Sequence, residues 1–363
     1  MSRLVIDARE SGTSTGRYVD KLVEYLARSK PSFEIVVLTK PHRVDYLRSA
    51  APAFDVQPAD YKEFSFAEQF GLKRRIKHLR PDLVHFAKDH QPVLYRGPAI
   101  TTMHDLTTLR FRNPAKHWLV FGLKQFVYKR VVKLVARKSV TILTPSKFVK
   151  DDIVRYTGAN PTKITVTYEA ADIITDAPEP IVGLDGKQFL VYLGRPTPHK
   201  NLERLIDAFV KIRASHPQLM LVLAGKKDAN YERIESDVRS RGIRGVYFAG
   251  FANEGRLRWL YENCAAYVFP SLSEGFGLPG LEAMTHGAPV VSSNATCLPE
   301  IYGDAAHYFD PLDTQAMADA INEVLTDKDL RAGLIRRGRE QAKKYSWQRM
   351  AEQTLSVYEQ ILK

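Results

Sequence analysis

The sequence predicts an α/β protein made of two successive doubly wound domains, each built on a parallel β-sheet. Short apolar segments alternate with amphipathic helical segments along the chain, which is the pattern of βα units. The chain has 363 residues, 44% of them hydrophobic, and this is enough for two ordinary cores. A segment rich in Pro, Asp and Gly, residues 172–186, interrupts the alternation. We therefore expect domains over residues 1–173 and 174–345.

The N-terminal half contains five short apolar segments that we predict to be buried strands. They are residues 3–7, 34–38, 83–86, 99–103 and 140–143. Gly12 and Gly16 lie in the loop between the first strand and a helix predicted over residues 18–27. Their spacing matches neither a dinucleotide fingerprint nor a P-loop. A strand, glycine loop and helix in this order suits the approach of a phosphate, and a tight turn without a ligand is the alternative.

Two histidines of this half have different expected roles. His104 directly follows the strand predicted over residues 99–103. Because ligands bind at the carboxyl ends of parallel strands, His104 is a candidate functional residue, although a structural role is the alternative. His85 lies within the strand predicted over residues 83–86 and is expected to be a hydrogen-bonded core histidine.

The C-terminal half repeats the alternation. Strands are predicted over residues 189–193, 220–224, 246–249, 266–269 and 290–292, with helices over 202–214, 231–239 and 254–263. Arg195 and Lys200 follow the first of these strands, where a planar guanidinium and a compact ammonium can converge on one anion. Asn201 is expected to cap the next helix with its side chain.

The segment PSLSEGFGLPGLEAMTHGAP, residues 270–289, carries the second cluster. Gly275 and Gly277 are small pivots, and Pro279 suits the first turn of a helix. The N–H groups at such a helix start, together with the helix dipole, suit the binding of a phosphate. A glycine-rich turn formed for packing alone is the alternative.

Glu274 and Glu282 lie on either side of these glycines. Their carboxylates can accept hydrogen bonds from hydroxyl groups on both sides of an anion. A nucleoside diphosphate sugar has this arrangement, with ribose and hexose hydroxyls at the two ends of a diphosphate. Complementing the helix dipole is the alternative role of either glutamate.

The net charge of +12 and the pI near 9.5 indicate an anionic partner, which leaves nucleic acid, an anionic membrane or a phosphorylated substrate open. A helix predicted over residues 116–138 carries many basic residues, and Lys73, Arg74, Arg75 and Lys77 lie upstream of it. These cations favour an anionic membrane, with a solvated face as the alternative. Nucleic acid ranks last, because no pattern interleaves aromatic with basic residues on a recognisable surface.

The cellular setting follows from the cysteines and from the lack of long apolar segments. Cys264 and Cys297 lie in apolar surroundings without a C-x-x-C spacing, and we expect buried thiols in a reducing compartment. No segment approaches 18 uninterrupted apolar residues. The sequence therefore favours a cytoplasmic protein that is soluble or lies peripherally on the inner face of the membrane.

Several motifs together resemble one large enzyme family, the retaining glycosyltransferases of family 4 with the GT-B architecture. The resemblance covers nearly the whole chain. The motifs are G-x-x-x-G-R-Y at residues 12–18, H-D-L at 104–106, T-P-S-K-F at 144–148, G-R-x-x-x-x-K-N at 194–201, S-E-G-F-G-L-P-x-L-E-A at 273–283, G-x-P-V-V at 287–291 and L-P-E-x-x-G-D-A-A at 298–306. In the first motif Thr15 precedes Gly16, where relatives often have Ile or Gly.

The resemblance implies two Rossmann-like domains facing across a cleft, with a final helix in residues 346–363 that crosses back onto the N-terminal domain. It places Arg195 and Lys200 on the diphosphate, Glu282 on the ribose, and Glu274 and His104 near the transferred sugar. The implied catalytic residues are His104, Arg195, Lys200 and Glu274. The implied donor-binding residues are Gly16, Arg195, Lys200, Gly275, Phe276, Gly277, Leu278 and Glu282.

We therefore predict transfer of a mannose- or glucose-type hexose from a nucleoside diphosphate sugar to a glycan hydroxyl, cell-envelope or lipid-linked, by front-side attack with retention. No metal or other cofactor is expected, because Arg195, Lys200 and the helix N-terminus can stabilise the leaving diphosphate without one. Asp327 and Asp329 form a D-x-D pattern, but it suits a helix cap. The alternatives are a phosphorylase or an epimerase of similar architecture, or a noncatalytic subunit that binds anionic glycans or nucleic acid.

Overall fold

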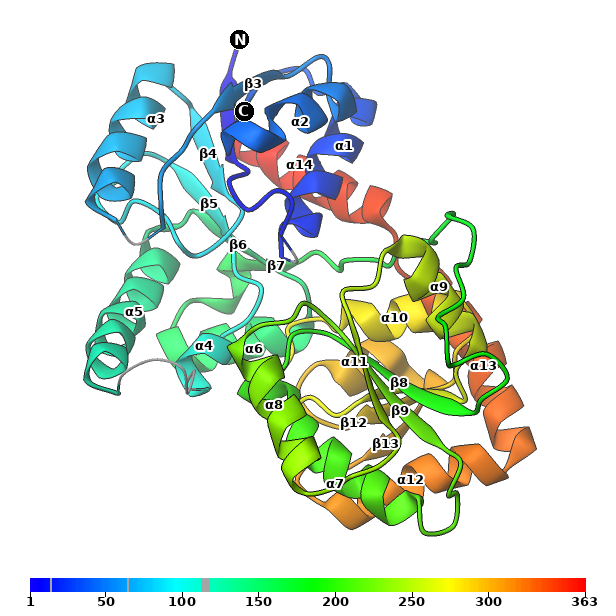
Figure 1. Ribbon diagram of the computed structural model, residues 1–363. Coiled ribbons are helices and arrows are strands. Elements are labelled where there is room, and N and C mark those ends of the chain that lie inside the picture. Colours follow the sequence, from blue (N-terminus) through cyan, green and yellow to red (C-terminus); the bar gives the residue numbers. More distant parts are fainter. Residues whose placement is uncertain (14, 64, 112–117) are drawn as a thin grey trace. The chain divides into compact units, whose positions relative to one another are not determined.

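The structure is a computed structural model that describes residues 1–13, 15–63, 65–111 and 118–363 (Figure 1). The chain forms two compact units. Unit 1 consists of Met1–Leu109, Gly122–Glu169 and Ser346–Lys363, and unit 2 consists mainly of Ala170–Tyr345. Each unit contains a parallel β-sheet, so the predicted α/β class with two parallel-sheet domains is confirmed.

The sheet of unit 1 has the strand order β3-β2-β1-β4-β5-β6-β7 in the described part of the chain, and all its neighbouring strands are parallel. The strands are β1 (Arg3–Asp7), β2 (Glu34–Thr39), β3 (Asp55–Pro58), β4 (Leu83–Phe86), β5 (Ala99–Thr102), β6 (Thr141–Thr144) and β7 (Ile164–Val166). The five predicted strands are present. The sequence did not indicate β3 and β7, which are edge strands of four and three residues, too short to stand out as a pattern.

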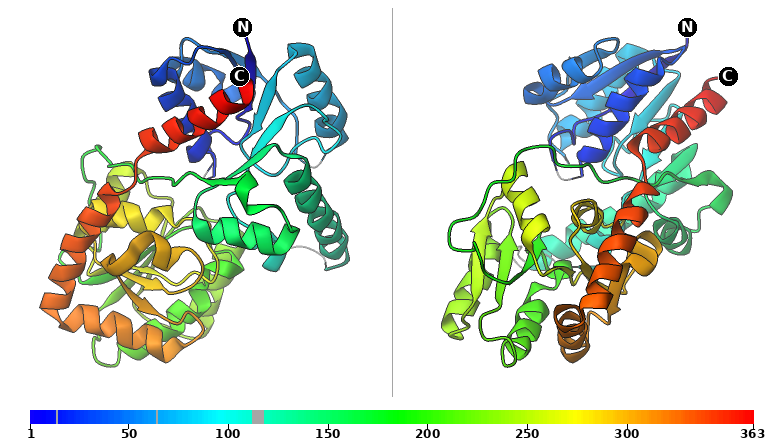
Figure 2. Two further views of the ribbon diagram at one scale, coloured as in Figure 1. Left: turned by 180° about the vertical axis from the view of Figure 1, so that it is seen from behind. Right: turned by 90° about the vertical axis from the view of Figure 1, so that its right-hand side faces the viewer.

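Helical segments cover the sheet of unit 1 (Figures 1 and 2). They are α1 (Arg17–Ser29), η1 (Pro41–Arg43), α2 (Val44–Ala50), η2 (Ala67–Leu72), α3 (Lys73–Leu79), α4 (Thr107–Arg110), α5 (Trp118–Lys138), α6 (Lys147–Thr157), η3 (Pro161–Lys163) and α14 (Trp347–Leu362). The helix predicted over residues 116–138 is α5, and its first two predicted residues lie outside the described residues.

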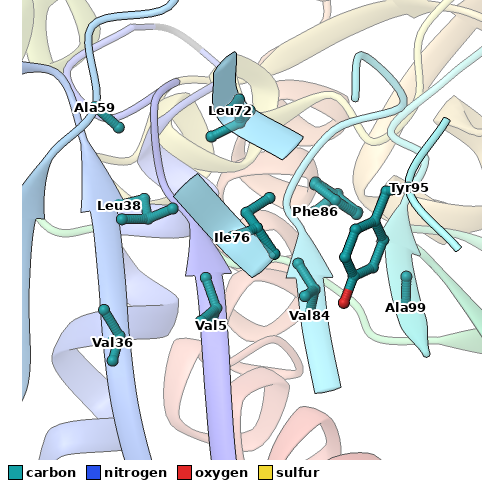
Figure 3. Close-up of a cluster of buried hydrophobic side chains, with 10 residues drawn as sticks. All are labelled: Val5, Val36, Leu38, Ala59, Leu72, Ile76, Val84, Phe86, Tyr95 and Ala99. Carbon is teal, nitrogen blue, oxygen red and sulfur yellow. The ribbon is translucent and has the colours of Figure 1, made fainter. Parts of the chain in front are cut away.

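The apolar residues of η2 and α3 pack on the sheet (Figure 3). Leu72 and Ile76 are buried against Val5 of β1 and Val84 of β4. This packing leaves the opposite side of η2 and α3 at the surface.

A buried hydrogen-bond chain joins the C-terminal helix α14 to the sheet. His85 of β4 contacts the hydroxyl of Tyr358 through Nδ1 at 2.5 Å and the hydroxyl of Thr102 through Nε2 at 2.8 Å. The Thr102 hydroxyl also lies 3.0 Å from that of Tyr18 in α1. Burial lowers the pKa of His85 to about 3, so the ring is neutral. The prediction of a core histidine is therefore confirmed.

Unit 2 has the strand order β10-β9-β8-β11-β12-β13. Its strands are β8 (Phe189–Leu193), β9 (Met220–Ala224), β10 (Val246–Gly250), β11 (Ala266–Phe269), β12 (Val290–Ser293) and β13 (Ala306–Phe309). Its helical segments are η4 (Pro198–Lys200), α7 (Leu202–Ile212), α8 (Ala229–Ser240), α9 (Glu254–Asn263), α10 (Leu278–Thr285), α11 (Leu298–Tyr302), η5 (Gly303–Ala305), α12 (Thr314–Thr326) and α13 (Lys328–Lys343). All five predicted strands are present, and β13 is an additional edge strand.

The predicted cap at Asp327 is confirmed. Its carboxylate accepts hydrogen bonds from the N–H groups of Asp329 and Leu330 at the start of α13, each at 2.9 Å. Among the described residues, no helix is both long and apolar enough to span a membrane.

The contact between His85 and Tyr358 leads to a stability prediction. Tyr358→Phe keeps the ring but leaves Nδ1 of the buried His85 without its hydroxyl partner, which should cost about 1–3 kcal/mol. Urea unfolding followed by circular dichroism measures this loss. The matched control is Tyr46→Phe, because Tyr46 is exposed and should change stability little. Equal stability of both variants would contradict the structural role of this contact.

Candidate functional site

The order of strands reverses within each sheet, and the predicted site of unit 2 lies at such a reversal. In unit 2, β8 lies between β9 and β11. The chain adds β9 and β10 on one side of β8, and then β11, β12 and β13 on the other side. Doubly wound sheets bind ligands at the carboxyl ends of the strands at this switch point. Arg195 and Lys200 follow β8, and Glu274 follows β11. Three predicted residues therefore come from the two loops of the switch point.

Lys200 and Glu274 are in direct contact. Nζ of Lys200 donates to Oε1 of Glu274 at 2.6 Å, and both side chains are mostly buried. The ammonium also lies 5.6 Å from the centroid of the Phe269 ring. The N–H of Leu272 donates to the carbonyl oxygen of His199 at 2.7 Å, which joins the two loops through their backbones. The loops thus hold a cation and a carboxylate side by side.

Arg195 is not part of this ion pair. Its Nη2 lies 3.3 Å from Oδ2 of Asp228, which also caps α8, and the Arg195 side chain is 64% exposed. An ion pair this exposed contributes little free energy, so a bound anion can replace it at small cost. The structure therefore leaves the guanidinium accessible at the end of β8.

The start of α10 has the geometry predicted for an anion-binding turn. Gly277 is the residue before the helix, has a φ of +94°, and no side chain caps the helix there. A Cβ atom on Gly277 would lie 2.5 Å from the Tyr302 hydroxyl oxygen, and this hydroxyl donates to the Gly277 carbonyl oxygen. Pro279 lies in the first turn, as predicted. Glycine is therefore required at position 277 for both conformation and space.

The neighbouring motif residues differ in accessibility. Phe276 is buried, and its ring packs edge-on against Tyr345 at 5.4 Å between centroids. Gly275 and Leu278 lie on either side of the Phe276–Gly277 pair, and Leu278 is the first residue of α10. Because the Phe276 side chain is buried, only its backbone could contact the sugar donor. Contacts of Gly275, Phe276, Gly277 and Leu278 with the sugar donor remain predictions.

Glu282 lies inside α10 and is almost fully buried. Its Oε2 accepts a hydrogen bond from the Tyr261 hydroxyl at 3.4 Å. The contact orients the carboxylate from a neighbouring helix. The role of Glu282 at the ribose remains a prediction.

The prediction for Asn201 was wrong. Asn201 is the residue before α7, but its φ is +61° and its side chain does not cap the helix. Instead Nδ2 donates to the carbonyl oxygens of Pro270 at 3.0 Å and Pro311 at 2.7 Å. Buried acceptors from distant segments replaced the local cap, and the contact with Pro270 fastens the loop after β11 to that after β8.

Both cysteines are free and buried, as predicted. Burial raises the pKa of Cys264 to about 12 and also raises that of Cys297. The thiol of Cys297 donates to the carbonyl oxygen of Glu274 at 3.3 Å. The two thiols are therefore packing groups and not nucleophiles.

Unit 1 has its own switch point between β1 and β4, where the sequence indicated the glycine loop after β1 but no ion pair. Nζ of Lys88, after β4, lies 3.1 Å from Oε2 of Glu10, after β1, and 3.8 Å from Oε2 of Glu63. Burial would raise the pKa of Glu10, but the hydrogen bond from Glu63 and the Lys88 charge lower it to about 2. The same hydrogen bond, together with burial, raises the pKa of Glu63 to about 7. The two carboxyl groups therefore share a proton.

His104 lies at the carboxyl end of β5, as predicted, and is held at both ring nitrogens. Nδ1 is 3.1 Å from Oε1 of Glu169, and Nε2 is 3.1 Å from the carbonyl oxygen of Ala87. Burial favours the neutral ring, but the hydrogen bond and charge of Glu169 raise the pKa of His104 above its usual value. Two acceptors suit an imidazolium that donates from both nitrogens. The sequence did not single out Glu169.

The glycine loop of unit 1 is shaped by sterics. A Cβ atom on Gly16 would lie 1.8 Å from the carbonyl oxygen of Glu10, so only glycine fits there. The N–H of Gly16 donates to the Thr13 hydroxyl at 3.0 Å. Gly12 has a φ of +78°. A phosphate contact of Gly16 remains a prediction. In the part of the chain that the structure describes, no three His, Cys, Asp or Glu side chains form a group that could hold a metal ion.

The two parallel-sheet α/β units have the architecture of GT-B glycosyltransferases. A family model described as Glycosyltransferase Family 4 matches residues 15–173, and one described as Glycosyl transferases group 1 matches residues 176–341. The chain belongs to the family 4 type of glycosyltransferases.

Individual relatives agree with this assignment. The chain is 29% identical to O-antigen chain mannosyltransferase B of Escherichia coli over 95% of this chain and 96% of the relative. The solved structure of sucrose-phosphate synthase from Thermosynechococcus elongatus matches with a TM-score of 0.79 at 20% identity, over 99% of both chains. Anabaena HepE in complex with UDP-glucose matches with a TM-score of 0.76 at 16% identity, over 99% of this chain and 100% of HepE. The two structural matches show the fold.

The shared proton in unit 1 leads to a pH prediction. Because the pKa of Glu63 in the folded state, about 7, exceeds its ordinary value of 4.5, its stabilising contribution is complete below about pH 4.5 and is lost as the pH rises through about 7. Glu63→Gln keeps a hydrogen-bond donor at every pH, so the fall in melting temperature across this range should be smaller. Glu359→Gln, an exposed change in α14, is the control and should retain the fall. Identical pH profiles for all three proteins would contradict the shared proton.

Proposed function

We propose that this glycosyltransferase moves a hexose from a nucleoside diphosphate sugar to a hydroxyl group of a glycan. The observation that supports this most is the Lys200–Glu274 pair at the switch point of unit 2, shortly before the uncapped start of α10. A cation and the positive end of a helix suit a diphosphate, and the carboxylate suits sugar hydroxyls. Glu282 is proposed to receive the ribose hydroxyls.

The chemistry follows from these groups. As the bond between the anomeric carbon and the diphosphate oxygen breaks, negative charge grows on the leaving diphosphate. We propose that Lys200, Arg195 and the start of α10 stabilise this charge, and one such donor typically contributes about 2.7–4 kcal/mol. We propose that no metal is needed, since these groups are already positive.

We further propose retention of the anomeric configuration by front-side attack. The acceptor oxygen forms its bond to the anomeric carbon on the face that the diphosphate leaves, and the acceptor proton passes to the departing diphosphate oxygen. His104 in unit 1 is proposed to contact the transferred sugar, with Nε2 exchanging its hydrogen bond to the Ala87 carbonyl oxygen for one to a sugar hydroxyl. The Glu169 carboxylate would keep the His104 ring protonated for this task.

Relatives support the choice of sugar. The Escherichia coli relative at 29% identity is an O-antigen chain mannosyltransferase, which favours a mannosyl donor such as GDP-mannose. The HepE structure contains UDP-glucose, so UDP-hexoses are the second class of donor to test. The name of the mannosyltransferase also favours a cell-envelope or lipid-linked glycan as acceptor, which fits an enzyme at the inner face of a membrane.

We propose that three residues of unit 1, Glu10, Glu63 and Lys88, bind the glycan acceptor. Glu10 and Glu63 offer a carboxylate and a protonated carboxyl group, each with an oxygen within 4 Å of the Lys88 ammonium. Such a set can both accept and donate hydrogen bonds to glycan hydroxyls.

The first test is the release of nucleoside diphosphate from GDP-mannose and from UDP-glucose with glycan acceptors. Lys200→Ala and Arg195→Ala should each lower kcat by about tenfold or more, because each removes a cation from the leaving group. Lys211→Ala, an exposed change in α7, is the charge-matched control. Full turnover in both site variants would remove these cations from the mechanism. Sugar 1-phosphate formed only with added phosphate would indicate a phosphorylase, and conversion of the donor without acceptor would indicate an epimerase.

The two glutamates should separate binding from transfer. Glu282→Gln should mainly weaken donor binding, because it removes the proposed acceptor of the ribose hydroxyls. Glu274→Ala should impair transfer while leaving the affinity for the nucleoside diphosphate largely unchanged. Calorimetry with GDP or UDP, together with kcat, distinguishes the two variants. Equal losses of affinity and turnover in both would contradict the separate roles.

A further inference from the structure

Two helical segments of unit 1 expose large apolar side chains to solvent. In η2 and the residue before it, Phe66 is 84% exposed and Phe70 is 54% exposed. In α5, Phe126 is 56% exposed and Val127 is 50% exposed. Three phenylalanines this exposed in two segments of one unit indicate a surface that contacts something apolar.

Basic side chains accompany two of these phenylalanines, Phe70 and Phe126. Nζ of Lys73 lies 5.4 Å from the centroid of the Phe70 ring, and Cζ of Arg130 lies 4.7 Å from that of Phe126. Lys133 and Arg137 continue the line of Phe126 and Arg130 along α5, at intervals of three and four residues. Such spacing places the four side chains on one side of the helix.

Acidic side chains do not neutralise these cations. Within the described ranges, none of Arg130, Lys133 and Arg137 of α5 forms an ion pair with a carboxylate, and the same holds for Lys73, Arg74 and Lys77 of α3. The positive charge of this side of unit 1 is therefore available to an anionic partner.

A cavity of about 690 Å³ lies beside α5 and adds a place for an anionic group. Its lining includes Arg130, Lys133, Arg137 and Lys163. Nζ of Lys163 is held by the carbonyl oxygens of Ala136, at 3.2 Å, and Arg137, at 2.8 Å, at the end of α5. Four cations around one hollow suit a phosphate.

The two segments lie along the same side of unit 1 (Figures 1 and 2). The loop between β4 and β5 joins them, since the N–H of Val93 donates to Oε1 of Gln69 in η2 at 2.8 Å. The carbonyl oxygen of Val93 in turn accepts from Nζ of Lys138 in α5 at 2.6 Å. The exposed sides of both segments therefore belong to one surface, which we call the α3–α5 face. It consists of Phe66, Phe70, Lys73, Arg74, Lys77, Phe126, Val127, Arg130, Lys133 and Arg137.

We propose that the α3–α5 face docks on the surface of an anionic lipid bilayer. The phenylalanines and Val127 would enter the boundary between headgroups and acyl chains, and the lysines and arginines would bind the lipid phosphates, one of them in the cavity beside α5. This surface specifies the membrane contact included in the proposed function, but its test requires no catalysis.

The aromatic geometry favours lipid over nucleic acid. Bases bind proteins by stacking on ring faces. The rings of Phe66 and Phe70 are stacked on each other, with centroids 6.5 Å apart and planes at 14°, and cations lie over Phe70 and Phe126. These ring faces are partly occupied, whereas insertion between lipid headgroups needs only exposed apolar area.

Cosedimentation of the full chain with vesicles tests the proposal. Vesicles of equal parts phosphatidylcholine and phosphatidylglycerol should bind the protein, and vesicles of phosphatidylcholine alone should bind it much less. Arg130→Gln, Lys133→Gln and Arg137→Gln combined should weaken binding roughly a hundredfold, about fivefold for each charge removed. High salt should also weaken binding, because the Debye length falls from about 10 Å at 0.1 M to about 3 Å at 1 M.

Two further variants separate the contributions. Phe66→Ser combined with Phe126→Ser should weaken binding to the same vesicles while preserving the charge. Arg244→Gln, Lys328→Gln and Arg336→Gln combined remove the same charge from exposed positions of unit 2 and should leave binding unchanged.

The outcomes are distinguishable from those of the catalytic test. Equal weakening by the two charge-removing triple variants, or equal binding to neutral and anionic vesicles, would overturn the proposal. Preferred binding to a single-stranded oligonucleotide over anionic vesicles, lost in the α5 variant, would assign the face to nucleic acid and overturn it too. The α5 variant should retain wild-type turnover with a soluble acceptor, because none of its changes lies at the proposed donor site.

Discussion

Contact between a lysine and a glutamate at a sheet switch point is the interaction on which the arrangement of the site depends. In unit 2, Lys200 and Glu274 come from the loops after β8 and β11, and their contact holds those two loops together. In unit 1, Glu10 and Lys88 come from the loops after β1 and β4. Both pairs form where the chain direction across the sheet reverses. Each unit therefore has a lysine–glutamate ion pair at the switch point of its sheet.

A charge pair in this position is suited to binding because it is easily rearranged. Removing two charges from water costs free energy that their attraction only partly recovers, so a mostly buried pair adds little net stability. In the proposed function, an incoming diphosphate would offer Lys200 a partner with more charge, and sugar hydroxyls would offer Glu274 new donors. Without a ligand, the ion pair thus keeps the side chains of Lys200 and Glu274 in place, yet it can break when a ligand binds. The side-chain hydrogen bonds of Asn201, which link the carbonyl oxygens of Pro270 and Pro311, keep the backbone in place during this exchange.

The sequence predicted what local pattern determines. The apolar segments and their turn residues were enough for the central strands, for the position of Gly277 before α10 and for the cap at Asp327. It did not predict β3 and β7, because edge strands of three or four residues carry little hydrophobic pattern.

The candidate site was predictable only where a motif groups its residues along the chain. Arg195 and Lys200 lie in one motif, whereas Glu10 and Lys88 are 78 residues apart and meet only because β1 and β4 are neighbours. Asn201 was assigned a local cap because helix-start statistics reflect local contacts. The two carbonyl oxygens that its side chain binds belong to segments far away in sequence, which no local pattern reveals.

The net charge of +12 illustrates the same limit. It indicates an anionic partner, and a diphosphate donor is an obvious candidate. In the structure, however, the cations of the proposed donor site are paired, Lys200 with Glu274 and Arg195 with Asp228. Among the residues that the structure describes, six cations without a carboxylate partner lie on the α3–α5 face, together with exposed phenylalanines. Part of the excess charge therefore belongs to a surface of unit 1 and not to the proposed donor site, and the two proposed functions can vary independently.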